Sequence, residues 1–191
     1  MNIVDLFLRE HGAGHSSAVV QHPLNSDSLW KGMGEAGLRT RPHGLNSLAW
    51  LFWHMTRVED ANVACAVAGT AQVLDDQWAS RLRVTRRDVG TGMTKAEVAE
   101  LSEQIDLQAL WDYREAVGRR TRALVSSLGS DYLLAPFTED DLRRAAAEGV
   151  LDGDEHWLVG IPREALLFWW GAHHTLMHVG QVMMVKNALR A

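Results

Sequence analysis

Apolar residues recur every three or four positions along most of this chain, which is the spacing of an amphipathic helix. Almost no stretch alternates between apolar and polar residues for long enough to predict a strand. The pattern therefore predicts an all-α protein. Its long helices are expected over residues 2–11, 46–68, 106–129 and 162–189.

Residues with special backbone preferences mark the ends of these helices. Gly69 stops the second helix, Asp106 fits the N-cap of the third, and Pro162 fits the first turn of the last. Shorter helices are expected near residues 28–33, after the capping box Thr94–Glu97, and over "TEDDLRRAAAEG".

Four long helices of this kind predict a four-helix bundle. The connection over residues 69–93 is long enough to cross the whole bundle, so the second and third helices would run parallel. No internal repeat, low-complexity segment or domain boundary interrupts the pattern. We expect a single domain over residues 1–191.

Composition and charge exclude several classes of protein. A net charge of -5 without a Lys/Arg cluster argues against a nucleic-acid partner. Cys65 is the only cysteine, which rules out an internal disulfide, and the N-terminus lacks a signal-peptide pattern, so a cytoplasmic protein is expected. The apolar run over residues 165–189 is interrupted by polar side chains, and no membrane span or membrane partner is expected.

The chain contains nine histidines, and most of them lie in polar or loop segments. These are expected at the surface: His11, His15, His22, His43 and His156. The other four fall on predicted helices among apolar residues. Three of them, His54, His174 and His178, are candidate ligands, whereas His173 lies about 100° from His174 around its helix.

His54 lies on one helical stripe of the second long helix and should point into the core. The stripe comprises Ser47, Trp50, Leu51, His54, Val58, Ala61 and Cys65. Taken alone, His54 at such a position is more typically a hydrogen-bonded core histidine than a metal ligand. Cys65 is about three turns, roughly 16 Å, further along and cannot bind the same ion.

The last helix changes this interpretation. With Glu164, Thr175 and Lys186 taken as its solvent face, His174 and His178 lie together, one turn apart. Two imidazoles at this spacing can bind one metal ion, and His54 from a facing helix would complete a set of three neutral nitrogen donors. The sequence thus predicts a metal site; the alternative is that these histidines are polar members of a helical core.

Two further residues are candidates for supporting roles. Gln181, three residues after His178, is expected either to hydrogen-bond to the site or to pack as a polar residue. Arg57 could face the mouth of the site and hold an anionic substrate, although Arg57, Glu59 and Asp60 are also typical of a solvated helix flank.

Two segments resemble a known superfamily. "RPHGLNSLAWLFWHMTRVEDA" resembles the second helix and its lead-in of the DinB-like (DNA-damage-inducible) superfamily, and "HHTLMHVGQ" resembles its H-x-x-x-H-x-G-Q segment on the fourth helix. The order of elements is similar as well, so the resemblance covers most of the chain. It implies a four-helix bundle in which zinc or nickel is held by three histidines, which fall here on His54, His174 and His178.

Characterised relatives in that superfamily include S-transferases and a maleylpyruvate isomerase that use bacillithiol, mycothiol or glutathione. The resemblance therefore implies a metal-dependent enzyme that holds a low-molecular-weight thiol as the thiolate, which attacks an electrophilic small molecule. Gln181 or Arg57 would orient the second substrate.

Other functions remain open at this point. One is a non-catalytic metal-binding or stress-response protein whose ion only cross-links the helices. Metal-assisted hydrolysis is disfavoured because no carboxylate is placed beside the histidine pair, and Thr175 stands where the H-E-x-x-H motif of zinc proteases has its glutamate. Exposed aromatic residues such as Trp30, Trp78 or Trp157 could mark a homodimer face.

Overall fold

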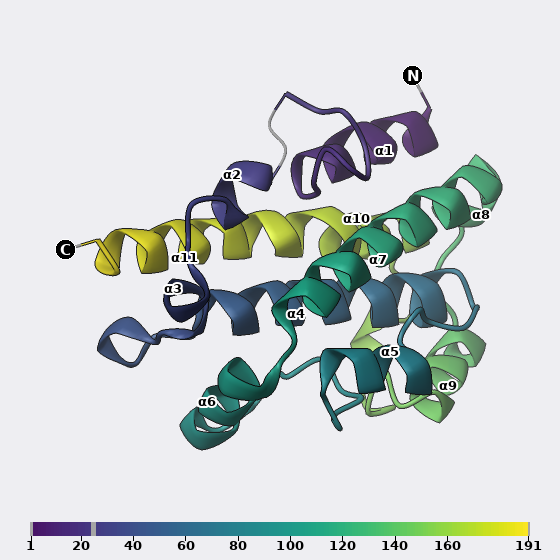
Figure 1. Cartoon of the computed structure of the whole chain (residues 1–191). Coiled ribbons are helices and arrows are strands. Elements are labelled where there is room, and N and C mark those ends of the chain that lie inside the picture. The colour runs from purple at the N-terminus through teal and green to yellow at the C-terminus, as the bar shows by residue number, and fades with distance from the viewer. Residues whose placement is uncertain (1, 24–25, 191) are drawn as a thin grey trace.

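Helices are the main secondary structure of the described part of the chain, residues 2–23 and 26–190 of the computed structural model (Figure 1). The α-helices are α1 (Ile3–Ala13), α2 (Asp27–Trp30), α3 (Glu35–Arg39), α4 (Leu48–Ala61), α5 (Asp76–Leu82), α6 (Lys95–Gln104), α7 (Leu107–Ser127), α8 (Ser130–Leu134), α9 (Glu139–Ala147), α10 (Arg163–Phe168) and α11 (His174–Ala188). Two short 3-10 turns, η1 (Pro42–Gly44) and η3 (His156–Leu158), and two π-helical segments, η2 (Asn62–Val67) and η4 (Trp169–His173), complete the helical elements. Within these ranges there is no strand, only an isolated bridge between Pro136 and Pro162.

The predicted start of α7 is confirmed by its cap, because Asp106 accepts the N–H of Ala109. Helix α4 begins at Leu48 rather than at residue 46, and Ser47 caps it by accepting the N–H of Trp50. Thr94 and Glu97 form the expected capping box. Side-chain oxygens at these positions satisfy helix N–H groups that have no partner within the helix.

Helix α4 is the centre of the fold and packs against both α7 and α11 (Figure 1). Every residue of α4 is buried, not only the stripe that contains His54. The expectation of a solvated flank at Arg57, Glu59 and Asp60 is therefore wrong. These charges are tolerated inside because each one has partners of opposite charge or hydrogen-bonding groups.

Helices α4 and α7 run in the same direction. Ser47, just before α4, forms a hydrogen bond with Ser102 in α6, which precedes α7. Thr56, further along α4, forms one with Arg114, further along the chain in α7, so the two segments advance in the same direction. The connection over residues 69–93 allows this direction, as the sequence predicted. It is not a plain loop, however, because it contains α5, which packs on α7.

The last long helical segment is interrupted by the π-helical segment η4, between α10 and α11. A π turn inserts a residue and rotates the following face relative to an ideal 3.6-residue helix. For this reason the solvent face predicted from Glu164, Thr175 and Lys186 is wrong in its second half. Thr175 is 1% exposed and Lys186 is 9% exposed, and the Lys186 ammonium donates to the carbonyl oxygen of Ser28.

The N-terminal third is more ordered than its polar sequence suggests. The segment between α1 and α4 contains α2 and α3, and α1 packs on α7 and η4. The surface location expected for His11 and His15 is wrong, because each is 1% exposed. His43 and His156 are exposed, as predicted.

The described part of the chain has no helix both long and apolar enough to cross a bilayer. Of the aromatic residues suggested as a dimer face, Trp157 is exposed and Trp78 is half-buried. The side chain of Trp30 is outside the described part of the structure.

Candidate metal centre

His54, His174 and His178 meet in the core at the contact between α4 and α11. We call these residues the histidine triad. Each is able to offer one ring nitrogen to a common point, and these nitrogen atoms lie within 4.8 Å of one another. The distance between the ring centroids of His54 and His178 is 4.9 Å, and Nε2 of His174 lies 3.2 Å from Nε2 of His178. The structure thus brings together the three residues that the sequence singled out.

The outer ring nitrogens explain which nitrogen faces the common point. Nδ1 of His54 lies 2.6 Å from the carbonyl oxygen of Val89, which can only accept a hydrogen bond. Nδ1 of this neutral imidazole therefore carries the proton and Nε2 keeps a free lone pair. In the same way, Nδ1 of His178 lies 2.9 Å from the amide oxygen Oε1 of Gln181, to which it donates a hydrogen bond. Histidines that bind metal ions almost always have such an acceptor behind them.

His54 and His174 are held in the neutral form that binds metal ions. Burial lowers the pKa of His174 to about 3, and the neighbouring His178 and His54 add to the effect. Burial also lowers the pKa of His54, against the hydrogen bond to Val89. The ring of Trp50 stacks on that of His54 with centroids 4.8 Å apart, which restricts the imidazole further. At neutral pH, protons therefore compete little with a metal ion for the ring nitrogens of His54 and His174.

A cavity of about 430 Å³ lies beside the triad and reaches His174. Its wall combines aromatic and apolar side chains with carboxylates, and among the residues that line it there is no lysine or arginine. It is lined in part by Trp169, Trp170, Asp88, Asp152 and Glu155. The cavity therefore has room for a small molecule next to the histidines, and its charge is negative.

Arg57 does not face this cavity as an anion-binding group. Its five N–H donors are engaged by acceptors that are buried or partly buried. Nη1 lies 3.0 Å from Oδ2 of Asp60 and 2.9 Å from the Tyr113 hydroxyl oxygen, while Nη2 lies 2.7 Å from Oε1 of Gln72. The remaining contacts are with the carbonyl oxygens of Arg87 and Asp88. The guanidinium instead ties α4 to the segment over residues 69–93.

Gln181 lies where the sequence placed it, on the turn after His178, with its amide oxygen toward the imidazole. Cys65 is buried, and burial together with the charges of Glu148 and Asp60 raises the pKa of its thiol to about 11. Cys65 therefore remains a protonated, inert side chain, as expected.

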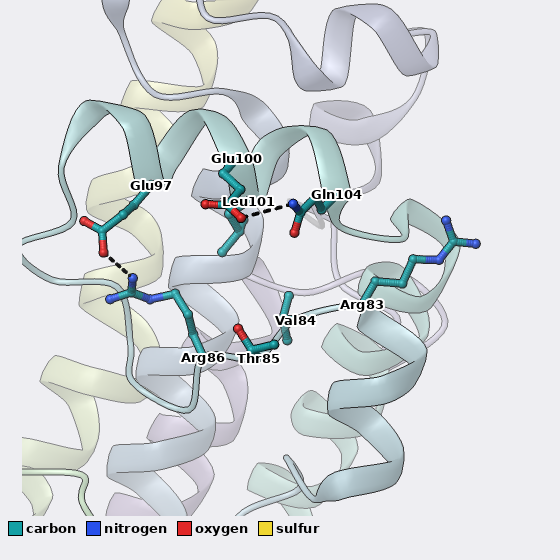
Figure 2. Close-up of a pocket in the computed structure, with 8 residues that line it drawn as sticks. All are labelled: Arg83, Val84, Thr85, Arg86, Glu97, Glu100, Leu101 and Gln104. Carbon is teal, nitrogen blue, oxygen red and sulfur yellow. Dashed lines mark hydrogen bonds and ion pairs between the residues drawn. The ribbon is translucent and has the colours of Figure 1, made fainter.

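A second pocket, between the end of α5 and α6, has a different character (Figure 2). It encloses about 150 Å³ and contains neither histidine nor cysteine among its lining residues. Arg86 pairs with Glu97 at 2.7 Å, and Gln104 donates to Glu100 at 3.1 Å (Figure 2). Because these polar groups already have partners in one another, the pocket offers no reactive group.

The structure also contains a second histidine cluster that the sequence reasoning missed. Nε2 of His11 lies 2.9 Å from Oε1 of Glu59, and Nε2 of His15 lies 2.8 Å from Oε2 of the same carboxylate. We call these three residues the Glu59 cluster; their donor atoms also lie close enough together to hold a metal ion. A signal was present in the sequence, since His11 and His15 are four residues apart, as are His174 and His178.

Comparison with known proteins supports the fold but gives no information on the chemistry of the site. No family model matches the chain, and no similar protein was found among the curated sequences. Among solved structures, the chain is similar to a conserved protein from Enterococcus faecalis, with a TM-score of 0.70 at 18% identity. The match covers 100% of this chain and 98% of that one. At this identity the likeness shows the fold alone, so function has to be argued from the residues of this chain.

Proposed function

We propose that this protein is a metal-dependent transferase of the DinB-like superfamily, built as a four-helix bundle. A small thiol loses its S–H proton to water, and its sulfur then forms a bond to an electrophilic carbon and displaces a leaving group such as halide. The observation that carries this proposal is the cavity beside the histidine triad, which gives a small molecule access to His174. An ion that only cross-linked α4 and α11 would need no such space.

The residues present fit a divalent ion. Three neutral nitrogen donors, two of them backed by oxygen acceptors, suit zinc or nickel, and fewer protein ligands than either ion accepts leave positions for a substrate. When bound, such an ion supplies a Lewis acid that stabilises a thiolate at neutral pH. The chain itself orients His54 through Val89 and His178 through Gln181, and Trp169 and Trp170 offer flat apolar surfaces to the substrate.

The charge of the cavity restricts the substrates we expect. Asp152 and Glu155 line it, and both oxygens of Glu155 accept backbone N–H groups, which keeps that carboxylate in place. Asp88 is paired with Arg86 at 2.9 Å and contributes less net charge. A cavity with fixed negative charge repels anions. Thiols that are neutral or cationic should therefore be accepted better than thiols that carry carboxylates.

Three thiols of similar size test this proposal: 2-mercaptoethanol (neutral), cysteamine (cationic) and thioglycolate (anionic). Each is offered to zinc- or nickel-loaded protein with a chromogenic aryl halide, and the rate is divided by the uncatalysed rate of the same thiol. We expect catalysis with the first two, at least about tenfold above thioglycolate, and none in His54→Ala. No rate above His54→Ala with any thiol would overturn the transferase; a preference for thioglycolate would overturn only the argument from charge.

The competing proposal is a non-catalytic metal-binding or stress-response protein, in which the ion only cross-links the helices. It predicts that removing the ion with a chelator lowers the melting temperature substantially, and that none of the thiols alters the spectrum of a cobalt-substituted site. A change in the cobalt spectrum on addition of cysteamine would favour the transferase, because it shows that a coordination position is open to a thiol.

A further inference from the structure

The Glu59 cluster is a buried charge arrangement that is already balanced without a metal ion. Both oxygens of Glu59 accept hydrogen bonds, one from each imidazole, and the two rings stack with centroids 4.2 Å apart. Arg114, from α7, is also buried and supplies the opposite charge. Burial lowers the pKa of His15 to about 4, while His15 and His11 hold the pKa of Glu59 well below its usual value against the effect of burial. At neutral pH His15 is uncharged, and the positive charge of Arg114 acts on the Glu59 carboxylate.

The outer nitrogens of this cluster argue against a metal ion there. In the described part of the structure, Nδ1 of His11 and Nδ1 of His15 have no hydrogen-bond partner. As long as Nε2 carries the proton, Nδ1 is a bare acceptor. Binding an ion through Nε2 would move the proton to Nδ1 and leave two buried N–H donors without acceptors, which is the costlier arrangement. The histidine triad has acceptors behind two of its three rings, and this cluster has none.

The segment that carries His11 and His15 lies against the part of the chain that positions His174. Phe7 packs on the π-helical segment η4 so closely that a Cβ on Gly171 would lie 2.8 Å from its ring. Gly14 approaches Thr175, the residue after His174, and a Cβ there would lie 2.8 Å from the Thr175 methyl group. The carbonyl oxygen of Gly14 accepts a hydrogen bond from Arg114. Both flanks of His174 are thus in contact with the N-terminal segment.

We infer that His11, His15 and Glu59 are positioning residues of the metal centre: by fixing the N-terminal segment to α4, they hold η4 and the start of α11 so that His174 meets His54 and His178. The inference rests on the metal centre proposed above. It assigns no ion to the Glu59 cluster and no contact with substrate.

Substitution of His15 tests this role through metal affinity. His15→Leu removes the hydrogen bond to Glu59, whereas His15→Gln keeps an N–H donor that can reach the carboxylate. The control is Val98→Ala, a buried truncation in α6, outside both clusters. Zinc affinity is measured by competition with a chromogenic chelator, and the melting temperature is recorded on metal-free protein.

We expect His15→Leu to bind zinc about tenfold more weakly than the unmodified protein, in the range seen for residues that orient metal ligands. His15→Gln should recover most of this loss. Val98→Ala should lower the melting temperature and leave zinc affinity within about twofold, because destabilisation alone does not move His174. If His15→Leu does not fold, the test uses His11→Gln and His15→Gln instead, again with Val98→Ala as the control. Each of these two variants should then bind zinc about threefold more weakly than the unmodified protein.

Two results would overturn the inference. One is unchanged zinc affinity in the His15 and His11 variants while the unmodified protein binds zinc. The other is binding of two ions to the unmodified protein and one to His15→Leu, which would make the Glu59 cluster a metal site itself. Failure of the unmodified protein to bind zinc or nickel would instead overturn the metal centre, so the two failures are distinguishable.

Discussion

The histidine triad and the Glu59 cluster are built from similar parts, and α4 contributes one residue to each. His54 and Glu59 are five positions apart on that helix, so their side chains point about 140° apart. Each cluster includes a pair of histidines spaced by four residues. In the triad the pair faces a third imidazole and is backed by Gln181; in the Glu59 cluster the pair donates to a carboxylate and has no acceptor behind it.

This difference shows what residue type and spacing leave undetermined. A histidine binds a metal ion through a free lone pair, and its other nitrogen decides which tautomer is present. The carbonyl oxygen of Val89 and the amide oxygen of Gln181 direct the lone pairs of the triad inward. In the other pair, Nε2 of His11 and Nε2 of His15 donate to Glu59 and have no lone pair for an ion. We therefore expect the triad to bind metal and the Glu59 cluster to contribute to folding.

The largest effect is expected for Glu59→Ala in metal-free protein. It leaves two buried imidazoles without their acceptor and Arg114 without its counter-charge, and breaking a buried charge arrangement costs about 3–5 kcal/mol of unfolding free energy. Urea unfolding measures the loss. His178→Ala, measured in the same way, should cost less because it leaves no charge unpaired. A larger loss in His178→Ala would contradict the contrast between the clusters.

Acid should destabilise the protein through the Glu59 cluster. The pKa of His15 is about 4 when folded and 6.5 when exposed, so between these values the unfolded chain binds a proton that the folded protein does not. Stability therefore falls as the pH drops from about 6.5 to about 4, by roughly 3 kcal/mol in total from this residue. Glu59, whose folded pKa is depressed, acts in the same direction below its unfolded value.

The measurement for this prediction is the urea midpoint of metal-free protein between pH 7 and pH 4. The decline should be shallower in His15→Gln, because its side chain does not titrate. Equal slopes in the two proteins would show that His15 does not take up a proton on unfolding.

Two glycines offer a matched pair of intermediate effect. A Cβ on Gly118 would lie 2.5 Å from Nδ1 of His15, and one on Gly180 would meet no atom within 4 Å. Gly118→Ala should lower the unfolding free energy by about 1–3 kcal/mol because it crowds the Glu59 cluster. Gly180→Ala should be neutral or stabilise α11 by up to about 1 kcal/mol. Similar melting temperatures for both variants would refute the close packing around His15.

A smaller effect, confined to metal binding, is expected for Gln181→Ala. Loss of the acceptor behind His178 should weaken zinc binding about 10–100-fold and leave the melting temperature of metal-free protein nearly unchanged. Gln104→Ala, which removes an exposed amide in α6, is the control and should leave zinc affinity as it is. An equal affinity in both variants would mean that Gln181 does not orient His178.

The parts of this fold and site that the sequence could predict are those determined locally. The caps at Thr94 and Asp106 and the inward direction of His54 follow from short-range patterns. The spacing of His174 and His178 survives because both lie after η4, within one regular helix. Their resemblance to the DinB-like motif stays a prediction.

What failed depended on contacts between distant segments. The π-helical segment η4 changes the register of the last helix, which an ideal helical period cannot anticipate, and Thr175 was misplaced for this reason. His15 lies past the end of α1 in a polar segment, and the hydrogen-bond partner of its buried ring, Glu59, is 44 residues away. Arg57 was misassigned because three of its acceptors, on Gln72, Arg87 and Asp88, come from the connection over residues 69–93, whose path the helical period does not reveal.

Metal content per chain tests the central claim most directly. Protein purified without a His-tag is loaded with zinc or nickel, freed of excess ion and measured by elemental analysis, alongside His174→Ala and His15→Gln. We predict one ion per chain in the unmodified protein and in His15→Gln, and none in His174→Ala. An ion that persists in His174→Ala but is lost in His15→Gln would contradict the account, since it would place the metal in the Glu59 cluster.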